Sequence, residues 1–433
     1  MTPGARISAV IELLDKIDRS FSQADEVVSS YVRGRRYIGS KDRRFISETV
    51  YSMIRYTAHL NWWTRSGTSR DKMIAYLAGI ESMPSRDLQQ LFDGTNYSPA
   101  PLSPVEMALI TTASLKPIAG ASVPALPGWV QAEFPEWLYA GMESYWGQSF
   151  RTEAKALNMP APVDLRVNTL KASCTRVLEI LKNDRLTAEP TPHSPLGLRL
   201  SVRRNLRATT AFKGGFVEIQ DEGSQLIALL TDATADHKTI DFCAGGGGKT
   251  LALAAAMKDR GSLLACDTHK GRLDKLTPRL KRAGVSNVSQ HLLTGPEDPW
   301  LREHRASAER VLIDVPCSGS GAWRRAPASK WRLTADTFQN YTSLQAAIMD
   351  QASLLVKPGG RLIYATCSVL PQENEKQIAA FLARTTVFRA IPIGALWEKF
   401  IGGTCPSPGN HLSLTPARTQ TDGFFCAVLE RLT

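Results

Sequence analysis

One stretch of the sequence decides the fold: Thr239-Ile240-Asp241-Phe242-Cys243-Ala244-Gly245-Gly246-Gly247-Gly248-Lys249-Thr250. It begins with apolar, strand-forming residues, continues through four glycines and leads into an apolar helical pattern over 250–258. Glycines between a strand and a helix let the backbone approach a ligand closely, and the helix N-terminus offers free N–H groups. The stretch therefore predicts the first strand–loop–helix unit of a ligand-binding α/β domain.

Downstream of this unit, apolar strand patterns alternate with helical ones. The expected strands are 262–266, 288–293, 310–315, 361–365 and 424–429. The expected helices are 270–283, 336–355 and 373–384. Alternation of this kind is typical of a parallel, doubly wound α/β sheet.

Upstream of this stretch, the spacing pattern of apolar residues changes twice along the sequence. Residues 5–95 show helical spacing of apolar residues, and a last helix is expected from Pro135 to about Phe150. Residues 161–236 mix two strand patterns, 163–168 and 216–220, with helical ones. We therefore expect three domains: an all-α domain over 1–150, a small α/β domain over 151–236, and the doubly wound domain over 237–433.

Composition limits the class of protein. The chain has 433 residues, 43% of them hydrophobic and 21% charged, which fits a globular protein of several domains. No apolar stretch approaches the roughly 20 residues of a membrane-spanning helix, and residues 1–18 lack a signal-peptide pattern. Seven cysteines form an odd, sparse set. This argues against a disulfide framework, so we expect a cytoplasmic protein without a membrane partner.

The charge is unevenly distributed. The formal net charge is +11, and the whole excess lies after residue 150. A local basic patch nevertheless occurs in the first domain, formed by Arg33, Arg35, Arg36, Lys41, Arg43 and Arg44. Such patches are typical of a polyanionic partner such as RNA, although a solvated surface would have the same composition.

Several ligands are conceivable for the glycine loop. A phosphate-binding P-loop would need glycine at Cys243, and a dinucleotide fingerprint would need glycine at Thr250. A nucleoside cofactor such as S-adenosylmethionine is favoured by Asp267, which ends the next strand and is able to accept hydrogen bonds from both ribose hydroxyls. A glycine turn that serves only packing remains the alternative.

Two further strand ends carry reactive side chains. Asp314 and Cys317 end the strand 310–315, and Cys367 follows the strand 361–365. The carboxyl ends of parallel strands meet at one crevice, so these residues should face the glycine loop. A zinc site is the rival explanation for paired cysteines, but no CxxC pair or histidine lies near them, so we expect no metal. A lone cysteine is usually a buried apolar residue, which is our interpretation of Cys174, Cys243, Cys266, Cys405 and Cys426.

These motifs resemble the RsmB/Sun family of RNA cytosine-5 methyltransferases. The resemblance lies in Asp241-x-Cys243-Ala244 with Gly247-Gly248-Lys249-Thr250, in Asp314-x-Pro316-Cys317-Ser318-Gly319 and in Ala365-Thr366-Cys367-Ser368-Val369. It extends to Arg166-Val167-Asn168, Gln220–Gln225, Arg324-Arg325-x-Pro327, Lys330-Trp331 and Asp422–Phe425. The first domain is similar to the NusB-like RNA-binding domain of the bacterial RsmB type.

The resemblance implies a Rossmann-like class I methyltransferase fold and S-adenosylmethionine as cofactor. The cofactor-binding residues would be Cys243, Ala244, Gly245, Gly246, Gly247, Gly248, Lys249, Asp267, Arg272 and Asp314. The chain departs from the family in two places. Gly245 and Gly246 replace Ala and Pro, and Thr294-Gly295-Pro296 replaces the acid expected after the third strand.

The catalytic residues implied by the resemblance are Cys367, Cys317 and Asp314. Cys367 would add as a thiolate to carbon 6 of cytosine, Asp314 would hydrogen-bond the base, and Cys317 would assist release. The implied substrate is small-subunit (16S) ribosomal RNA, bound by a monomer. Two alternatives stay open: a cytosine-5 methyltransferase acting on tRNA, and a catalytically decayed, NusB-like RNA-binding or assembly factor.

Overall fold

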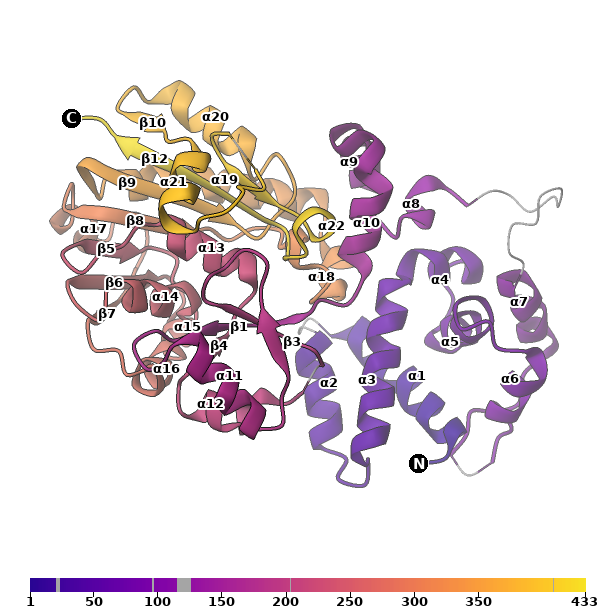
Figure 1. Cartoon of the computed structure of the whole chain (residues 1–433). Coiled ribbons are helices and arrows are strands. Elements are labelled where there is room, and N and C mark those ends of the chain that lie inside the picture. Colours follow the sequence, from indigo (N-terminus) through magenta and orange to yellow (C-terminus); the bar gives the residue numbers. More distant parts are fainter. Residues whose placement is uncertain (21–23, 96, 115–125, 203, 408) are drawn as a thin grey trace. The chain divides into compact units, whose positions relative to one another are not determined.

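The computed structural model describes residues 1–20, 24–95, 97–114, 126–202, 204–407 and 409–433 (Figure 1). The chain forms two compact units: Met1–Met159 with Arg325–Leu333, and Pro160–Arg324 with Thr334–Thr433. The boundary expected at residue 150 falls instead at the start of a helix of the first unit. The two expected C-terminal domains, 151–236 and 237–433, contribute most of their residues to the second unit.

The described part of the first unit is helical, as its apolar spacing predicts. Its α-helices are α1 (Pro3–Arg19), α2 (Ala24–Arg33), α3 (Ser40–Arg55), α4 (Thr57–Thr64), α5 (Ser69–Ala75), α6 (Ser85–Leu91), α7 (Pro104–Ser114), α8 (Gly128–Gln131), α9 (Glu136–Trp146) and α10 (Phe150–Asn158). A π-helix, Tyr76–Ile80, continues α5, and a short 3-10 helix, Gly147–Ser149, precedes α10.

The helix expected from Pro135 to Phe150 is shorter than predicted. α9 ends at Trp146 because Gly147 has φ +52°, a left-handed conformation that stops the helix. Apolar side chains on one face of α1, including Ile7, Val10 and Leu13, are buried in the core of this unit. The sequence also predicts a short helix over 105–115, which corresponds to α7, and its last residue lies outside the described residues.

A short segment from the middle of the chain completes the first unit. This segment, 325–333, contains α18 (Pro327–Arg332). The indole N–H of Trp331 donates to the Ile54 carbonyl at 2.8 Å. The buried Lys330 amine donates to the Glu133 carbonyl at 2.7 Å and to Asn158 Oδ1 at 2.9 Å. α18 is therefore a structural part of this unit, although its sequence neighbours belong to the other.

The second unit contains a large sheet with the predicted parallel core. Its strands are β5 (Lys238–Asp241), β6 (Ser262–Asp267), β7 (Val288–Leu292), β8 (Ala308–Asp314), β9 (Val356–Thr366), β10 (Phe388–Ala390), β11 (Leu412–Leu414) and β12 (Phe424–Arg431). Within the described residues the order is β7-β6-β5-β8-β9-β12-β10, with β11 pairing β12. The first five of these are parallel, whereas β12 runs antiparallel to β9.

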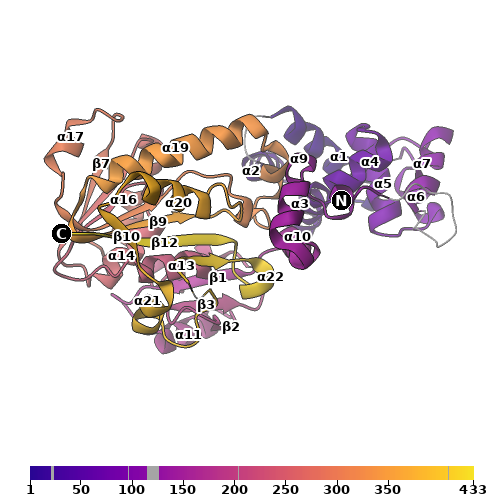
Figure 2. The ribbon, with the colours of Figure 1, turned by 90° about the horizontal axis from the view of Figure 1, so that it is seen from above.

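Helices cover both faces of this sheet (Figure 2). α19 (Ala335–Ser353) and α20 (Glu375–Arg384) pack on one face, and α13 (Glu222–Leu230), α14 (Gly248–Ala256) and α21 (Ile393–Phe400) on the other. Residues alternate between the two cores along β12: Phe424, Cys426 and Val428 face one, and Phe425, Ala427 and Leu429 the other. Burial on both faces explains why these strands read as continuous apolar runs.

A smaller antiparallel sheet precedes the large one in the sequence. Its order is β2-β3-β1-β4, from β2 (Ala188–Pro190), β3 (Gly197–Leu200), β1 (Val163–Val167) and β4 (Val217–Ile219). α11 (Cys174–Asn183) and α12 (Thr210–Lys213) cover it. The remaining short helices of this unit are α15 (Lys270–Leu273), α16 (Leu276–Ala283), α17 (Pro299–Glu303) and α22 (Pro416–Thr419), with 3-10 turns at Leu206–Ala208 and Ser320–Ala322.

Candidate active site

The strand order of the large sheet reverses at β5. β5 pairs β6 on one side and β8 on the other, so the loops at the carboxyl ends of β5 and β8 lead away in opposite directions. Such a switch point is where open α/β sheets bind their ligands. Asp241 ends β5 and Asp314 ends β8, which places both carboxylates at this point.

The glycine loop turns sharply between β5 and α14. Ala244 N donates to the Cys266 carbonyl at 2.8 Å, and Gly247 N donates back to the Ala244 carbonyl at 2.9 Å. Gly247 has φ +82°, and a Cβ there would lie 2.1 Å from Leu276 Cδ1. Any larger residue at 247 would therefore strain the backbone and require Leu276 to move. α14 begins at Gly248, so its free N–H groups point into the loop.

Asp267 fixes the loop from the neighbouring strand. Its Oδ2 accepts from Gly245 N at 2.9 Å and its Oδ1 from His269 N at 2.8 Å. Each carboxylate oxygen keeps a lone pair for a further donor. Arg272 is exposed on α15, directly after this strand. Burial raises the pKa of the Cys243 thiol well above its usual value, so this side chain packs rather than reacts.

The site has the properties that S-adenosylmethionine requires. Asp241 is fully buried, Thr250 Oγ1 donates to its Oδ2 at 2.7 Å, and no described residue bonds its Oδ1. Burial raises the pKa of Asp241 to about 7. An unpaired carboxylate oxygen beside a glycine turn suits a ligand that brings hydrogen-bond donors and positive charge, as this cofactor does.

Lys249 and Asp314 form an ion pair at the same edge of the sheet. The distance from Lys249 Nζ to Asp314 Oδ2 is 2.6 Å. Burial alone would lower the pKa of Lys249, but the Asp314 carboxylate outweighs it and raises that pKa. Lys249 therefore remains a cation.

The two cysteines singled out in the sequence lie side by side. The distance from Cys317 Sγ to Cys367 Sγ is 3.4 Å, and both are free thiols. Gly321 N also donates to the Cys367 carbonyl at 3.0 Å, so the loops after β8 and β9 are directly linked. The hydrogen bond with Cys367, burial and the nearby Glu373 carboxylate together raise the pKa of Cys317 well above its usual value.

A buried carboxylate that sequence reasoning missed lies behind the two thiols. Glu373 Oε1 accepts from Ser318 N at 2.8 Å and from Gln345 Nε2 at 2.9 Å. Its Oε2 accepts from the hydroxyls of Ser318 and Ser368, both at 2.5 Å. The available signal was a glutamate six residues past Cys367, close behind the apolar Val369-Leu370-Pro371.

The loop after β7 has no carboxylate at 294–296, where the family has an acid. The carboxylate that this loop uses is Asp298. Asp298 Oδ2 accepts from Thr294 N at 2.8 Å, and its Oδ1 accepts from Trp300 N at 3.0 Å. The backbone N–H groups of Thr294 and Trp300 lower the pKa of Asp298 to about 2. This carboxylate therefore folds its own loop and caps α17.

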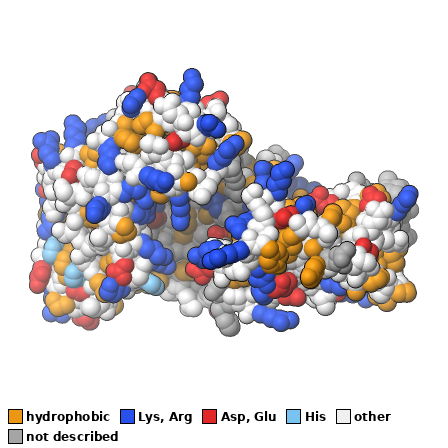
Figure 3. Space-filling view, turned by 90° about the horizontal axis from the view of Figure 1, so that it is seen from below, with side chains coloured by type: hydrophobic (Ala, Val, Ile, Leu, Met, Phe, Trp, Pro, Cys, Tyr) orange, Lys and Arg blue, Asp and Glu red, His pale blue; other side chains and the backbone are white. Residues whose placement is uncertain are grey.

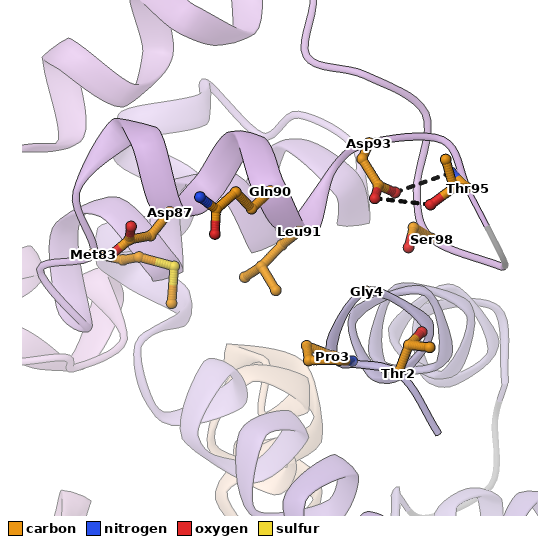
Figure 4. Close-up of a pocket in the computed structure, with 10 residues that line it drawn as sticks. All are labelled: Thr2, Pro3, Gly4, Met83, Asp87, Gln90, Leu91, Asp93, Thr95 and Ser98. Carbon is orange, nitrogen blue, oxygen red and sulfur yellow. Dashed lines mark hydrogen bonds between the residues drawn. The ribbon is translucent and has the colours of Figure 1, made fainter.

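The first unit contains a separate polar pocket of about 460 Å³ (Figure 4). Asp87 and Asp93 line it, and Asp93 is already bonded to Thr95 N and Thr95 Oγ1. None of the predicted site residues lies there.

Among the residues that the structure describes, no group of three metal-ligating side chains occurs. No helix in the described ranges is long and apolar enough to cross a membrane.

Two family models match the chain. The model of 16S rRNA methyltransferase RsmB/F matches residues 228–430, and that of the ferredoxin-like domain of RsmF/B-like methyltransferases matches 134–207. A probable ribosomal RNA small subunit methyltransferase B from Synechocystis is 34% identical over 306 residues, which cover 70% of this chain and 67% of that protein.

Solved structures show the same architecture. The crystal structure of PH0851 superposes with a TM-score of 0.80 at 24% identity, covering 100% of this chain and 99% of that one. A methyltransferase homologue from Pyrococcus horikoshii gives a TM-score of 0.61 at 26% identity, covering 70% of this chain and 97% of that one.

The strand order and the glycine loop at the switch point define a Rossmann-like, class I S-adenosylmethionine-dependent methyltransferase. Together with the matches along the sequence, they establish that the chain belongs to the RsmB/Sun family of RNA methyltransferases. S-adenosylmethionine is its cofactor, as the sequence motifs predict.

Proposed function

We propose that this chain is an RNA (cytosine-5)-methyltransferase that acts on 16S ribosomal RNA through a covalent intermediate. One observation carries the proposal: two free thiols lie 3.4 Å apart at neighbouring strand ends, beside the Lys249–Asp314 ion pair. Carbon 5 of cytosine is a weak nucleophile, and addition of a thiolate at carbon 6 activates it. S-adenosylmethionine, bound by the Cys243–Lys249 loop and Asp267, supplies the methyl group.

Cys367 is the nucleophile in this proposal. Its thiolate forms the sulfur–carbon 6 bond, and the electron pair of the carbon 5–carbon 6 double bond becomes available at carbon 5. Asp314 accepts a hydrogen bond from the exocyclic amine of the base, and Lys249 holds that carboxylate in place at 2.6 Å.

Cys317 acts at release. After methylation, water takes up the carbon 5 proton, the electron pair of that C–H bond re-forms the double bond, and the electron pair of the carbon 6–sulfur bond leaves on the Cys367 sulfur. Cys317 stays a neutral thiol because its pKa is raised, so its S–H is able to donate to the departing sulfur 3.4 Å away.

Substitution of each cysteine tests these roles. Cys367→Ala should abolish methylation and form no covalent RNA complex. Cys317→Ala should methylate slowly and accumulate a protein–RNA adduct that survives denaturing electrophoresis. An adduct in Cys367→Ala but not in Cys317→Ala would reverse the roles, and normal methylation by both variants would refute covalent catalysis by these residues.

The RNA substrate is tested in cells. Bisulfite sequencing of RNA from a deletion strain should reveal one cytosine of 16S ribosomal RNA that has lost its methyl group. A lost site in tRNA would instead establish the tRNA alternative. Unchanged methylation throughout, together with no cofactor binding by calorimetry, would favour a decayed RNA-binding factor.

We further infer that residues 1–150 form a NusB-like RNA-binding domain and that the protein works as a cytoplasmic monomer. Support for RNA binding by this segment comes from its helical fold and from the basic residues between Arg33 and Arg44. Lys and Arg side chains are also spread over the face of the molecule in Figure 3. A target cytosine must leave its stack to reach the crevice, so single-stranded or looped RNA is the cheaper substrate.

A further inference from the structure

We propose that Glu373 is the positioning residue that holds the two cysteine loops in register, a role that rests on the proposed function. Glu373 is fully buried, and its side chain touches neither thiol through a hydrogen bond. It contacts instead the serine that follows each cysteine: Ser318 after Cys317 and Ser368 after Cys367.

The contacts show how one side chain sets both loops. The Ser318 backbone and hydroxyl each donate to a different oxygen of Glu373, which fixes the orientation of the loop after β8. The Ser368 hydroxyl donates to the same Oε2, which ties the loop after β9 to it. Gln345 of α19 donates both to Glu373 Oε1 and to the Pro316 carbonyl, each at 2.9 Å, and so closes the arrangement.

A second layer of polar contacts stiffens the arrangement. Ser320 Oγ lies 2.9 Å from Ser368 Oγ and accepts from Val369 N at 3.0 Å. The Tyr364 hydroxyl donates to the Glu373 carbonyl at 2.6 Å. All these polar atoms are buried, so removing the carboxylate leaves several donors without a partner, and the loops must move to satisfy them.

Loop movement should affect the reaction because Cys367 bonds carbon 6 of the base and Cys317 must lie within reach of the Cys367 sulfur at release. A displacement of about 1 Å at reacting atoms costs on the order of 100-fold in rate. Glu373→Ala should therefore lower kcat about 100-fold, with the dissociation constant for S-adenosylmethionine unchanged within about threefold, because no cofactor-loop residue bonds Glu373.

The conservative variant separates hydrogen bonding from charge. The amide of Glu373→Gln can accept from Ser318 N and Gln345 through its oxygen and donate to both serine oxygens through its nitrogen. It should therefore restore kcat to within about threefold of the wild-type value. Failure of this variant to exceed Glu373→Ala would overturn positioning through hydrogen bonds.

A chemical readout distinguishes this proposal from the catalytic one. Diamide accepts two electrons and two protons from a pair of thiols as their S–S bond forms, and peptide mapping identifies the Cys317–Cys367 product. This closure needs only adjacent thiols, so it is measurable even if the protein methylates no cytosine. Glu373→Ala should close the bond at least tenfold more slowly than wild type, and Glu373→Gln at nearly the wild-type rate.

Asp232→Asn is the matched control, because Asp232 pairs with Arg310 and Arg361 on the same two strands, β8 and β9, away from the thiols. It should leave both disulfide closure and kcat unchanged. Equal slowing by Asp232→Asn, or closure by Glu373→Ala at the wild-type rate, would overturn the proposal. If Glu373→Ala does not fold, Ser368→Ala removes one arm of the same contact and should slow closure in the same direction; unchanged closure would again overturn the proposal.

Discussion

Asp267 serves two functions at the scale of a single residue. It holds the glycine loop through Gly245 N and orients the following turn through His269 N. We predict that Asp267→Ala weakens S-adenosylmethionine binding by about 1.5–3 kcal/mol, because hydrogen bonds to a charged acceptor are lost. Titration calorimetry measures this directly. Asp274→Ala is the control, since Asp274 is exposed and pairs with Lys270; equal effects of the two changes would refute the assignment.

Single residues also show what the sequence could reveal about the site. Asp314, Cys317 and Cys367 were predictable because each ends or follows an apolar strand, and parallel strands bring such ends together. The contact of Lys249 with Asp314 was not predictable, because Lys249 follows the glycine run and there looks like a residue that contacts the cofactor. Glu373 was not predictable because its role depends on two serine partners, Ser318 and Ser368, which lie 55 and 5 residues away in the sequence.

The glycine loop illustrates how an element depends on its packing. Gly247 and Gly359 share a left-handed conformation, φ +82° and +74°, but only Gly247 would bring a Cβ against a neighbour. We predict that Gly247→Ala lowers the free energy of unfolding by about 1–3 kcal/mol more than Gly359→Ala does, because Leu276 must move. It should also weaken cofactor binding, whereas Gly359→Ala should not. Urea unfolding and calorimetry measure both effects, and equal losses would contradict the close contact.

Long apolar elements were predictable and short ones were not. The central parallel strands were recognisable because burial on two faces produces continuous apolar runs. α19 was recognisable from its length and the helical spacing of the residues that it buries, such as Gln345, Met349 and Ala352. The helix expected at 270–283 is broken into α15 and α16, because Pro278 lacks the N–H that would bond the Asp274 carbonyl. β2 was missed because it has three residues and ends in a proline, which suits only an edge strand.

At the scale of the whole molecule, RNA binding should depend on fewer charges than the sequence indicates. Arg35 is paired with Glu12 at 2.7 Å and lies over the Tyr31 ring, and Arg44 is paired with Glu48 at 2.8 Å. Among the described residues, Arg33, Arg36, Lys41 and Arg43 remain exposed without a carboxylate partner.

We predict that changing three of them, Arg36, Lys41 and Arg43, to Gln weakens RNA binding and flattens its salt dependence. The slope of log K against log salt should fall by about 2, since each contact to single-stranded RNA contributes about 0.7. Filter binding at several salt concentrations measures it. Changing the exposed Arg65, Arg86 and Arg151 to Gln is the control with the same charge loss. An equal fall in both variants would mean that the patch has no special role.

Lys330 should make the stability of the first unit depend on pH. Burial lowers the pKa of Lys330 to about 7. Between that pH and the ordinary lysine pKa of about 10.4, the unfolded chain holds a proton that the folded chain has lost, so unfolding free energy rises with pH. Relative to that of Lys330→Met, the free energy of unfolding of the wild type should rise by up to about 1.4 kcal/mol per pH unit across this range. Urea unfolding at pH 6 to 10 measures the difference, and a constant difference would refute it.

The path of the chain through α18 has a consequence for how such proteins can be recombined. The polypeptide passes between the two units at 159–160, 324–325 and 333–334, so no single junction separates them. A gene fragment encoding only residues 1–159 lacks the tryptophan and lysine that fill its own interior. Grafting this unit onto another enzyme therefore requires a second splice, which inserts 325–333 into a loop of the recipient.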